Sequence, residues 1–164
     1  MNSLAIIILL LPIGWPLQTD PSTAGHPKGP SVHVKIGSVA SCQGLSKIRS
    51  IPFKKGETVD DPAYNRIMGQ GKAVIPCLID HLTDTTKMKD PRSAPAITDF
   101  RVGDLAFFLL TDITETEFEQ WLPDSVNSKL KDRGVYAFIE YVGQPRNRRT
   151  LQEKWRAWLA QQNK

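Results

Sequence analysis

The stretch AVIPCLIDHLTD, residues 73–84, contains a proline, a cysteine and a histidine in an otherwise apolar run, and its interpretation decides the fold. At about 100° per residue its aliphatic side chains fall on one continuous stripe, which predicts an amphipathic helix. Pro76 is compatible with this helix, because a proline in the first turn leaves no helical hydrogen bond unmade. The side chains of the stripe are Val74, Ile75, Leu78, Ile79 and Leu82.

The stretch DFRVGDLAFFLLTDIT, residues 99–114, predicts a second helix, with Thr98 or Asp99 as its N-cap. Apolar side chains on most sides of this helix indicate that neighbouring elements cover it from several directions. Gly103 has no side chain, so we expect another helix to approach closely there.

Other segments carry helical signals over shorter distances. Asp61 and Pro62 are typical of a helix N-terminus. Thr114 and Glu117 fit a capping box for a short helix that follows them. Residues 135–142 have a helical period, although their composition also suits a strand. A stripe predicts a last helix, which starts at Asn147 and carries Leu151, Trp155, Trp158 and Leu159.

The N-terminal segment differs from the rest of the chain. Its first 17 residues carry no charge and include an unbroken apolar block from Leu4 to Leu11. This block is shorter than the roughly 20 apolar residues that span a bilayer, and it fits the core of a secretory signal peptide. We expect a signal peptide over residues 1–24, a linker over 25–41 and a helical domain over 42–162. The alternatives are an uncleaved membrane tether and a buried core segment.

The chain has two cysteines, Cys42 and Cys77. In an exported chain they predict one disulfide, whereas in a cytosolic chain they would be buried thiols. Cys77 and His81 are neighbours on the predicted helix and form a candidate nucleophile and base. Side chains so placed on one helix rarely face a common substrate cleft, so we predict that the chain has no catalytic residue.

A metal site needs three or four ligands. The histidines are His26, His33 and His81, and His26 lies in the expected linker. No HxxxH or CxxC spacing occurs, and neither does a nucleotide-binding loop nor a G-x-S-x-G motif. The sequence therefore predicts no metal site and no cofactor.

Basic side chains concentrate around the start of the last predicted helix: Arg146, Arg148, Arg149 and Arg156. One interpretation is a solvated helix face, and the other is a surface that binds an acidic partner. The net charge of +4 permits acidic partners without requiring nucleic acid. We predict a protein partner with an acidic surface, no nucleic acid, and membrane contact only through an uncleaved signal segment.

Residues 73–114 resemble a HEAT-type helical repeat. That family pairs the pattern A-x-P-x-L-I-x-x-L-x-D with a following V-x-x-x-A-x-x-L-x-x-I helix. The matching side chains are Ala73, Pro76, Leu78, Ile79, Leu82 and Asp84, then Val102, Ala106, Leu109 and Ile113. This sequence has one additional residue before the proline, a longer loop and no second copy at a fixed period. The resemblance implies paired antiparallel helices and protein binding, and it supplies no catalytic residues.

These observations predict an all-α fold, a compact bundle of antiparallel helix pairs that is HEAT-like and follows a signal peptide and a coil segment. The leading hypothesis is an exported, non-enzymatic scaffold, periplasmic or secreted, that binds a protein. Immunity proteins that neutralise periplasm-targeted toxins are an analogue at the level of architecture. The rival hypotheses are a hydrolase with a non-sequential site and a cytosolic helical adaptor.

Overall fold

The computed structural model describes residues 40–54, 56–92, 97–162 and 164. The expected signal peptide and all but the end of the expected linker lie outside these residues. The described chain is helical and forms no strand, only an isolated antiparallel bridge between Lys87 and Arg101. Its α-helices are α1 (Pro62–Met68), α2 (Ile75–His81), α3 (Val102–Thr114), α4 (Asp124–Arg133), α5 (Val135–Val142) and α6 (Pro145–Gln162). The short 3-10 helices are η1 (Leu45–Lys47), η2 (Gly71–Val74) and η3 (Phe118–Trp121).

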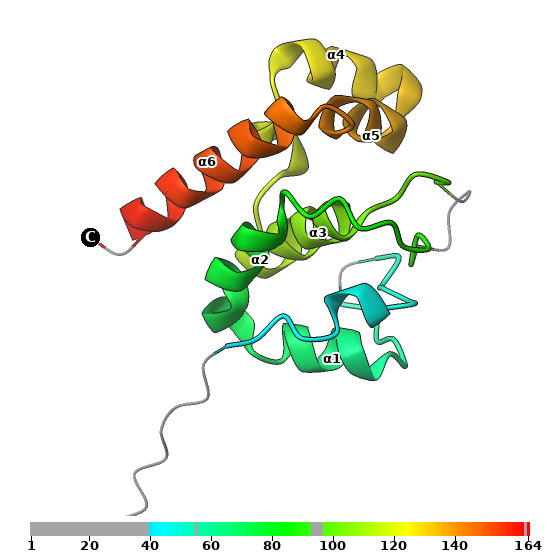
Figure 1. The fold of residues 1–164 in the computed structure, drawn as a ribbon, viewed down its shortest axis with the longest axis vertical. Helices are drawn as coiled ribbons and strands as arrows, with labels where there is room; N and C mark the ends of the chain where they lie inside the picture. The colour runs from blue at the N-terminus through cyan, green and yellow to red at the C-terminus, as the bar shows by residue number, and fades with distance from the viewer. Residues whose placement is uncertain (1–39, 55, 93–96, 163) are drawn as a thin grey trace, which may run out of the picture. The chain divides into compact units, whose positions relative to one another are not determined.

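The stretch 73–84 forms the end of η2 and the whole of α2, as its apolar period predicts. Every side chain of the predicted stripe is buried, while Cys77 and His81 are half-buried at its edge. Helix α2 packs against α3 in the middle of the described domain (Figure 1). Helix α1 and the segment before it lie on one side of this pair, and α4, α5 and α6 lie on the other.

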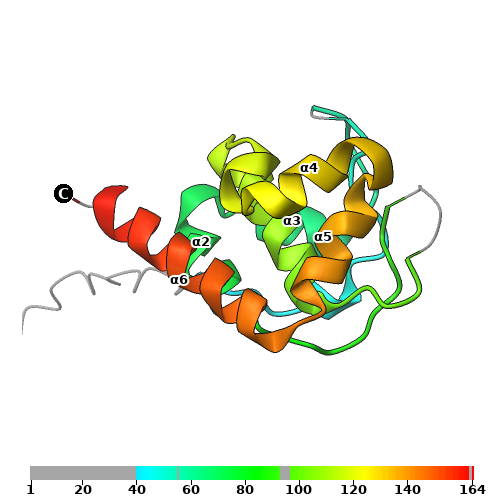
Figure 2. The same cartoon turned by 90° about the horizontal axis from the view of Figure 1, so that it is seen from above.

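Helix α3 is the central element. Neighbouring helices pack against several of its faces, which explains why it carries apolar side chains on most sides. Phe107 lies away from α2, where its ring stacks on Phe138 of α5 at 4.8 Å between centroids. The ring of Phe107 also meets Trp155 of α6 edge to face. The second view shows α5 and α6 running past α3 on this side (Figure 2). The predicted cover from several directions is therefore confirmed.

The predicted start of this helix is wrong by a few residues, because α3 begins at Val102 with Arg101 as its N-cap. Thr98 and Asp99 form a turn, and residues 100–102 lie alongside residues 86–88: Met88 donates its N–H to the Phe100 carbonyl at 3.0 Å, and Val102 donates to that of Thr86 at 3.0 Å. These long-range backbone bonds hold Thr98 and Asp99 outside the helix.

The predicted capping box after α3 is also wrong. Thr114 is the last residue of α3, and its hydroxyl donates to the Leu110 carbonyl at 2.7 Å. Glu115 then adopts a left-handed conformation, with φ of 55°, which ends the helix. Residues 135–142, whose composition suits helix or strand, form α5.

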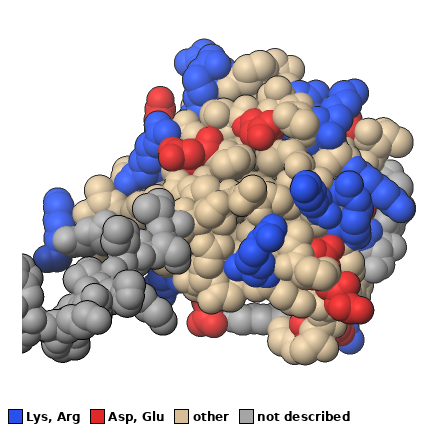
Figure 3. Space-filling model, turned by 60° about the horizontal axis from the view of Figure 1, so that its bottom comes forward, with Lys and Arg blue, Asp and Glu red and all other residues tan. Residues whose placement is uncertain are grey.

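Charged side chains stay at the surface with few exceptions. On the face drawn in Figure 3, basic and acidic side chains lie in small interspersed groups around a broad area of other residues. The buried charged residues of the described chain are Asp61, Asp90, Asp104 and Arg148. Arg148 was expected at a partner-binding surface, and that placement is wrong: the side chain is only 3% exposed.

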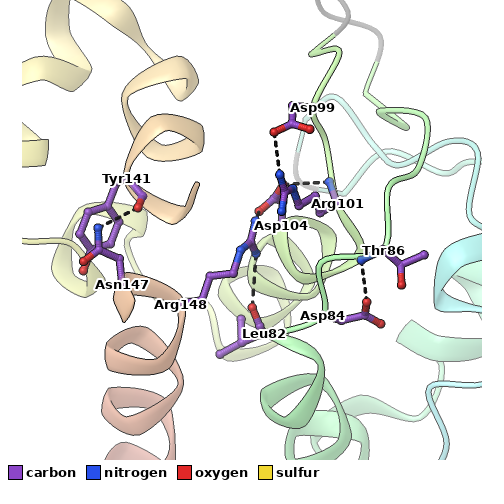
Figure 4. Close-up of polar contacts among 9 residues, drawn as sticks. All are labelled: Leu82, Asp84, Thr86, Asp99, Arg101, Asp104, Tyr141, Asn147 and Arg148. Atoms are coloured by element: carbon purple, nitrogen blue, oxygen red, sulfur yellow. Dashed lines mark hydrogen bonds and ion pairs between the residues drawn. The ribbon is translucent and has the colours of Figure 1, made fainter. Parts of the chain in front are cut away.

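Arg148 joins α6 to both α2 and α3 (Figure 4). Its Nη2 donates to Asp104 Oδ1 at 2.7 Å, and its Nη1 donates to the Leu82 carbonyl at 3.3 Å. Asp104 Oδ2 accepts the backbone N–H of Arg101 at 2.9 Å, so the same carboxylate also caps the start of α3. Burial raises the pKa of Asp104, even though Arg148 and the Arg101 N–H favour its charged form.

Helix α6 thereby supplies partners for carbonyls at the end of α2. A helix leaves its last four carbonyls without partners of its own. Gln152 donates its amide to the Ile79 carbonyl at 2.9 Å and to that of Asp80 at 3.2 Å, one turn along α6 from Arg148. The expected close approach at Gly103 occurs here, because a Cβ at that position would lie 2.5 Å from the Leu82 carbonyl oxygen.

Replacing Arg148 by Met is expected to lower the free energy of unfolding by about 3–5 kcal/mol, because the Asp104 carboxylate is left buried without its partner. Asp104→Asn should cost a similar amount, since the guanidinium is then left uncompensated. The double variant should lose less than the sum of the single losses, because neither charge remains alone. Urea unfolding followed by far-UV circular dichroism measures these free energies.

The matched control is Arg149→Met, which removes an exposed guanidinium from the next position of α6. Its effect should stay within about 0.5 kcal/mol. Additive losses in the double variant, or an Arg148→Met loss no larger than that of the control, would contradict the pairing.

Candidate functional site

The structure brings together three residues whose side chains can act as nucleophile, base or metal ligand: Cys42, Cys77 and His81. Cys77 and His81 lie one turn apart on α2, and Cys42 comes from the irregular segment before η1. The two sulfurs and a ring nitrogen of His81 all lie within 4.8 Å of one another. Cys42 is buried, while Cys77 and His81 are half-buried, so the group is reachable from one side.

The two cysteines lie at disulfide-bonding distance. Their Cα atoms are 6.0 Å apart, within the usual range for a disulfide. The backbone N–H of Cys42 also donates to Cys77 Sγ at 3.0 Å. The predicted proximity of Cys42 and Cys77 is therefore confirmed, and a bond between them would fasten the irregular segment to α2.

Asp61 holds the chain that follows η1 against the start of α1. Its Oδ1 accepts the N–H groups of Ala63 and Tyr64 at 3.0 and 2.9 Å, as the predicted N-cap should. Its Oδ2 accepts those of Arg49 and Ser50 at 2.7 and 3.1 Å. Burial acts to raise the pKa of Asp61, but these four N–H donors outweigh it and hold that pKa below its usual value.

Three further hydrogen bonds fix the part of the segment nearest Cys42. The Gln70 side chain accepts the N–H of Ser41 at 2.8 Å and donates to its carbonyl at 2.9 Å. Arg66 Nη2 donates to the Gln43 carbonyl at 2.8 Å. The backbone on both sides of Cys42 is thus also positioned by α1 and the turn after it, in addition to its contacts with Cys77 Sγ.

The His81 ring is oriented by its own helix. Nδ1 lies 2.9 Å from the Cys77 carbonyl oxygen. Because a carbonyl only accepts, Nδ1 must carry a proton, and in the neutral ring the free lone pair is then on Nε2. Within the described residues no hydrogen bond joins His81 to a carboxylate, so the carboxylate-oriented arrangement of many nucleophile–base sites is absent from this part of the chain.

A pocket of about 420 Å³ adjoins the three residues. It is lined by residues 40–46 and by Cys77, His81, Asp84 and Val102. Asp84 already accepts the N–H of Thr86 at 2.9 Å through Oδ1. The pocket gives a small molecule or water access to the group.

The basic residues predicted to bind a partner do not form one surface. Arg146 and Arg149 are exposed in the first turns of α6 and form no ion pair with the described residues. Arg156 is exposed and pairs with Asp80 of α2 at 2.9 Å. Arg148 is buried, as described above.

The sequence alone does not predict that the side chain of His81 lies beside both cysteine sulfurs. The spacing of Cys77 and His81 already predicts that they are neighbours on the helix. The contribution of Cys42 depends on the contacts of Asp61 and Gln70, which link segments far apart in sequence.

No helix of the described chain combines the length and apolar character needed to cross a bilayer.

Comparison with protein-family models, with curated proteins and with solved structures finds no match to this chain. The fold and the site together define a class of protein. Its described part is an all-helical domain with a cysteine pair and a histidine at the edge of the central helix pair.

We expect the native protein to resist alkylation at both cysteines until it is reduced, because a disulfide leaves no free thiol. Replacing Cys42 and Cys77 together by Ala should lower the free energy of unfolding by about 3–4 kcal/mol in the chain-entropy model, for a sequence separation of 35. Mass spectrometry after iodoacetamide treatment and urea unfolding provide the measurements. Rapid labelling of Cys77 alone in the native protein would instead indicate a nucleophile beside His81.

Stability should also fall in acid through Asp61. Its folded-state pKa lies below the unfolded value of about 3.9, so its contribution is present above that pH and is lost as the pH falls through the folded pKa. Asp61→Asn removes this contribution, and the difference in unfolding free energy from the parent should shrink from about 1–3 kcal/mol at neutral pH toward zero in acid. Urea unfolding at a series of pH values measures it. Asp60→Asn, at the exposed neighbouring position, is the control, and an equal effect of both would refute the role of Asp61.

Proposed function

We propose that the chain is an exported, non-enzymatic helical scaffold that binds a protein partner. The observation that carries the export part is the cysteine pair at disulfide-bonding distance, because disulfides persist in oxidising compartments outside the cytosol. The uncharged apolar block at residues 4–11 supports the same proposal from the sequence. The periplasm and the extracellular space are both compatible with it.

The binding surface in this proposal is the exposed side of the first turns of α6. Arg146 and Arg149 are three residues apart, so they lie on one face of the helix. They also lie near the positive end of the dipole of an 18-residue helix, which adds to their potential. Arg156 extends this face, because its exposed pair with Asp80 is weak and a partner carboxylate can replace it at little cost.

This surface favours a partner with an acidic face. Two guanidinium groups without ion pairs among the described residues accelerate association with a negatively charged protein and fix its orientation. Immunity proteins remain the architectural analogue. In this proposal nucleic acid is not a partner, and a membrane is contacted only through the N-terminal segment if it is not cleaved.

The orientation of His81 supports a scaffold over a hydrolase. Its Nδ1 proton is used in a bond to the carbonyl of Cys77, on its own helix, and the neighbouring sulfur lies at bonding distance from Cys42. A cysteine nucleophile requires a free thiolate, which a disulfide removes. A cytosolic adaptor is distinguished by a chain that still begins at Met1 and carries two free thiols.

Affinity purification of the tagged chain from its native host tests the proposal. We expect a one-to-one complex with an acidic protein that dissociates more readily as salt is raised. Arg146→Glu combined with Arg149→Glu should weaken the complex at least about tenfold, since like charges then face the partner. The control is Lys129→Glu with Lys131→Glu, which changes the net charge equally on the exposed part of α4.

Intact-mass analysis of the same preparation tests export. The expected product lacks about the first 24 residues and has the mass of an oxidised cysteine pair. A soluble product that begins at Met1 with two free thiols would refute export. Equal binding by both double variants would refute the proposed surface.

A further inference from the structure

The histidine beside the cysteine pair has no role in the scaffold described above. A disulfide needs only Cys42 and Cys77, and His81 contributes nothing to it. Yet its ring nitrogen and both sulfurs lie within 4.8 Å of one another. Two thiolates and one imidazole are ligands that select thiophilic ions such as Zn²⁺ and Cu⁺.

The geometry points to a metal site: in the reduced chain, Cys42, Cys77 and His81 bind one thiophilic metal ion. The ligands come from two elements, since Cys77 and His81 are adjacent on α2 and Cys42 faces them from the irregular segment. A tetrahedral ion needs a fourth ligand, and the adjoining pocket of about 420 Å³ admits water or a small anionic ligand to that position.

The orientation of His81 suits this role. Metal-binding histidines commonly donate their second ring N–H to a carboxylate or a backbone carbonyl, which fixes the tautomer. The Nδ1–H of His81 makes this bond to the Cys77 carbonyl at 2.9 Å and leaves the Nε2 lone pair for the metal.

The proposal expects Cys42 to stay near α2 when the disulfide is opened, because hydrogen bonds from α1 and the turn after it also hold the backbone on either side of Cys42. Gln70 holds Ser41 and Arg66 holds Gln43, the residues on either side of Cys42. The Cα atoms of the cysteines are 6.0 Å apart. After reduction no bond joins the sulfurs, so rotation about the Cα–Cβ bonds can separate them and let an ion lie between them.

The two states are linked by a balanced exchange. A dithiol reductant gives up two electrons and two protons, becomes a disulfide itself, and converts the Cys42–Cys77 bond into two thiols. Binding of the metal ion then releases the two thiol protons and forms two metal–sulfur bonds. In the reverse exchange a disulfide oxidant accepts two electrons and two protons and becomes a dithiol, while Cys42 and Cys77 form their bond, which removes both sulfur ligands and expels the ion.

The test uses the full chain, reduced with a phosphine and then separated from it without air. Titration with Zn²⁺ against a chromophoric chelator is expected to show one ion per reduced chain and none per oxidised chain. Co²⁺, added as a spectroscopic probe, should produce the charge-transfer absorption of thiolate ligation in the reduced chain only. Equal Zn²⁺ binding by reduced and oxidised chains would overturn the proposal.

Variants identify the ligands. His81→Ala should weaken Zn²⁺ binding at least about tenfold, and Cys42→Ser should reduce the charge-transfer absorption of Co²⁺. Tyr136→Ala, which truncates an exposed side chain on α5, should change neither. If His81→Ala binds Zn²⁺ as tightly as the parent, the site does not include His81 and the proposal is wrong.

Circular dichroism separates loss of the site from loss of the fold. If reduction unfolds the helical domain, Zn²⁺ should restore its helical spectrum, because binding to an assembled site stabilises the folded state. A reduced chain that remains unfolded in the presence of Zn²⁺ would also overturn the proposal. None of these outcomes bears on the binding of an acidic partner by α6.

Discussion

The buried guanidinium of Arg148 determines how the last helix lies on the rest of the domain. An arginine taken out of water is tolerated only where it meets a carboxylate and further acceptors. Asp104 on α3 and the Leu82 carbonyl after α2 provide them, and Gly103 leaves the room that this approach requires. Any sliding of α6 would separate these groups, so the contact selects one arrangement of three helices.

The apolar period predicts most of the helices, because each buries one stripe against its neighbours. The charge of Arg148 predicts exposure, yet the residue lies three positions before Leu151 and seven before Trp155, on the same buried stripe of α6. Its spacing was a better indicator than its charge. The start of α3 could not be predicted from local sequence, since the competing backbone bonds come from residues 86–88.

In the candidate site, too, one part follows from the local sequence and another part depends on contacts between distant segments. The neighbouring positions of Cys77 and His81 follow from the helical period alone. The place of Cys42 depends on long-range contacts: Gln70 and Arg66 hold the backbone on either side of it, and Asp61 caps α1 with one oxygen and binds residues 49 and 50 with the other. A capping residue is recognisable in the sequence, but its second set of donors is not, because nothing local identifies Arg49 and Ser50 as its partners.

The contact between α6 and α2 also has a consequence for synthesis on the ribosome. The donors that serve the Leu82 and Ile79 carbonyls lie 66 and 73 residues further along the chain. Until those residues have emerged, the Leu82 carbonyl lacks its Arg148 donor, and the Ile79 carbonyl keeps only its local bond from the N–H of Leu82. Although domains commonly fold as soon as they are synthesised, this one closes only with its last helix.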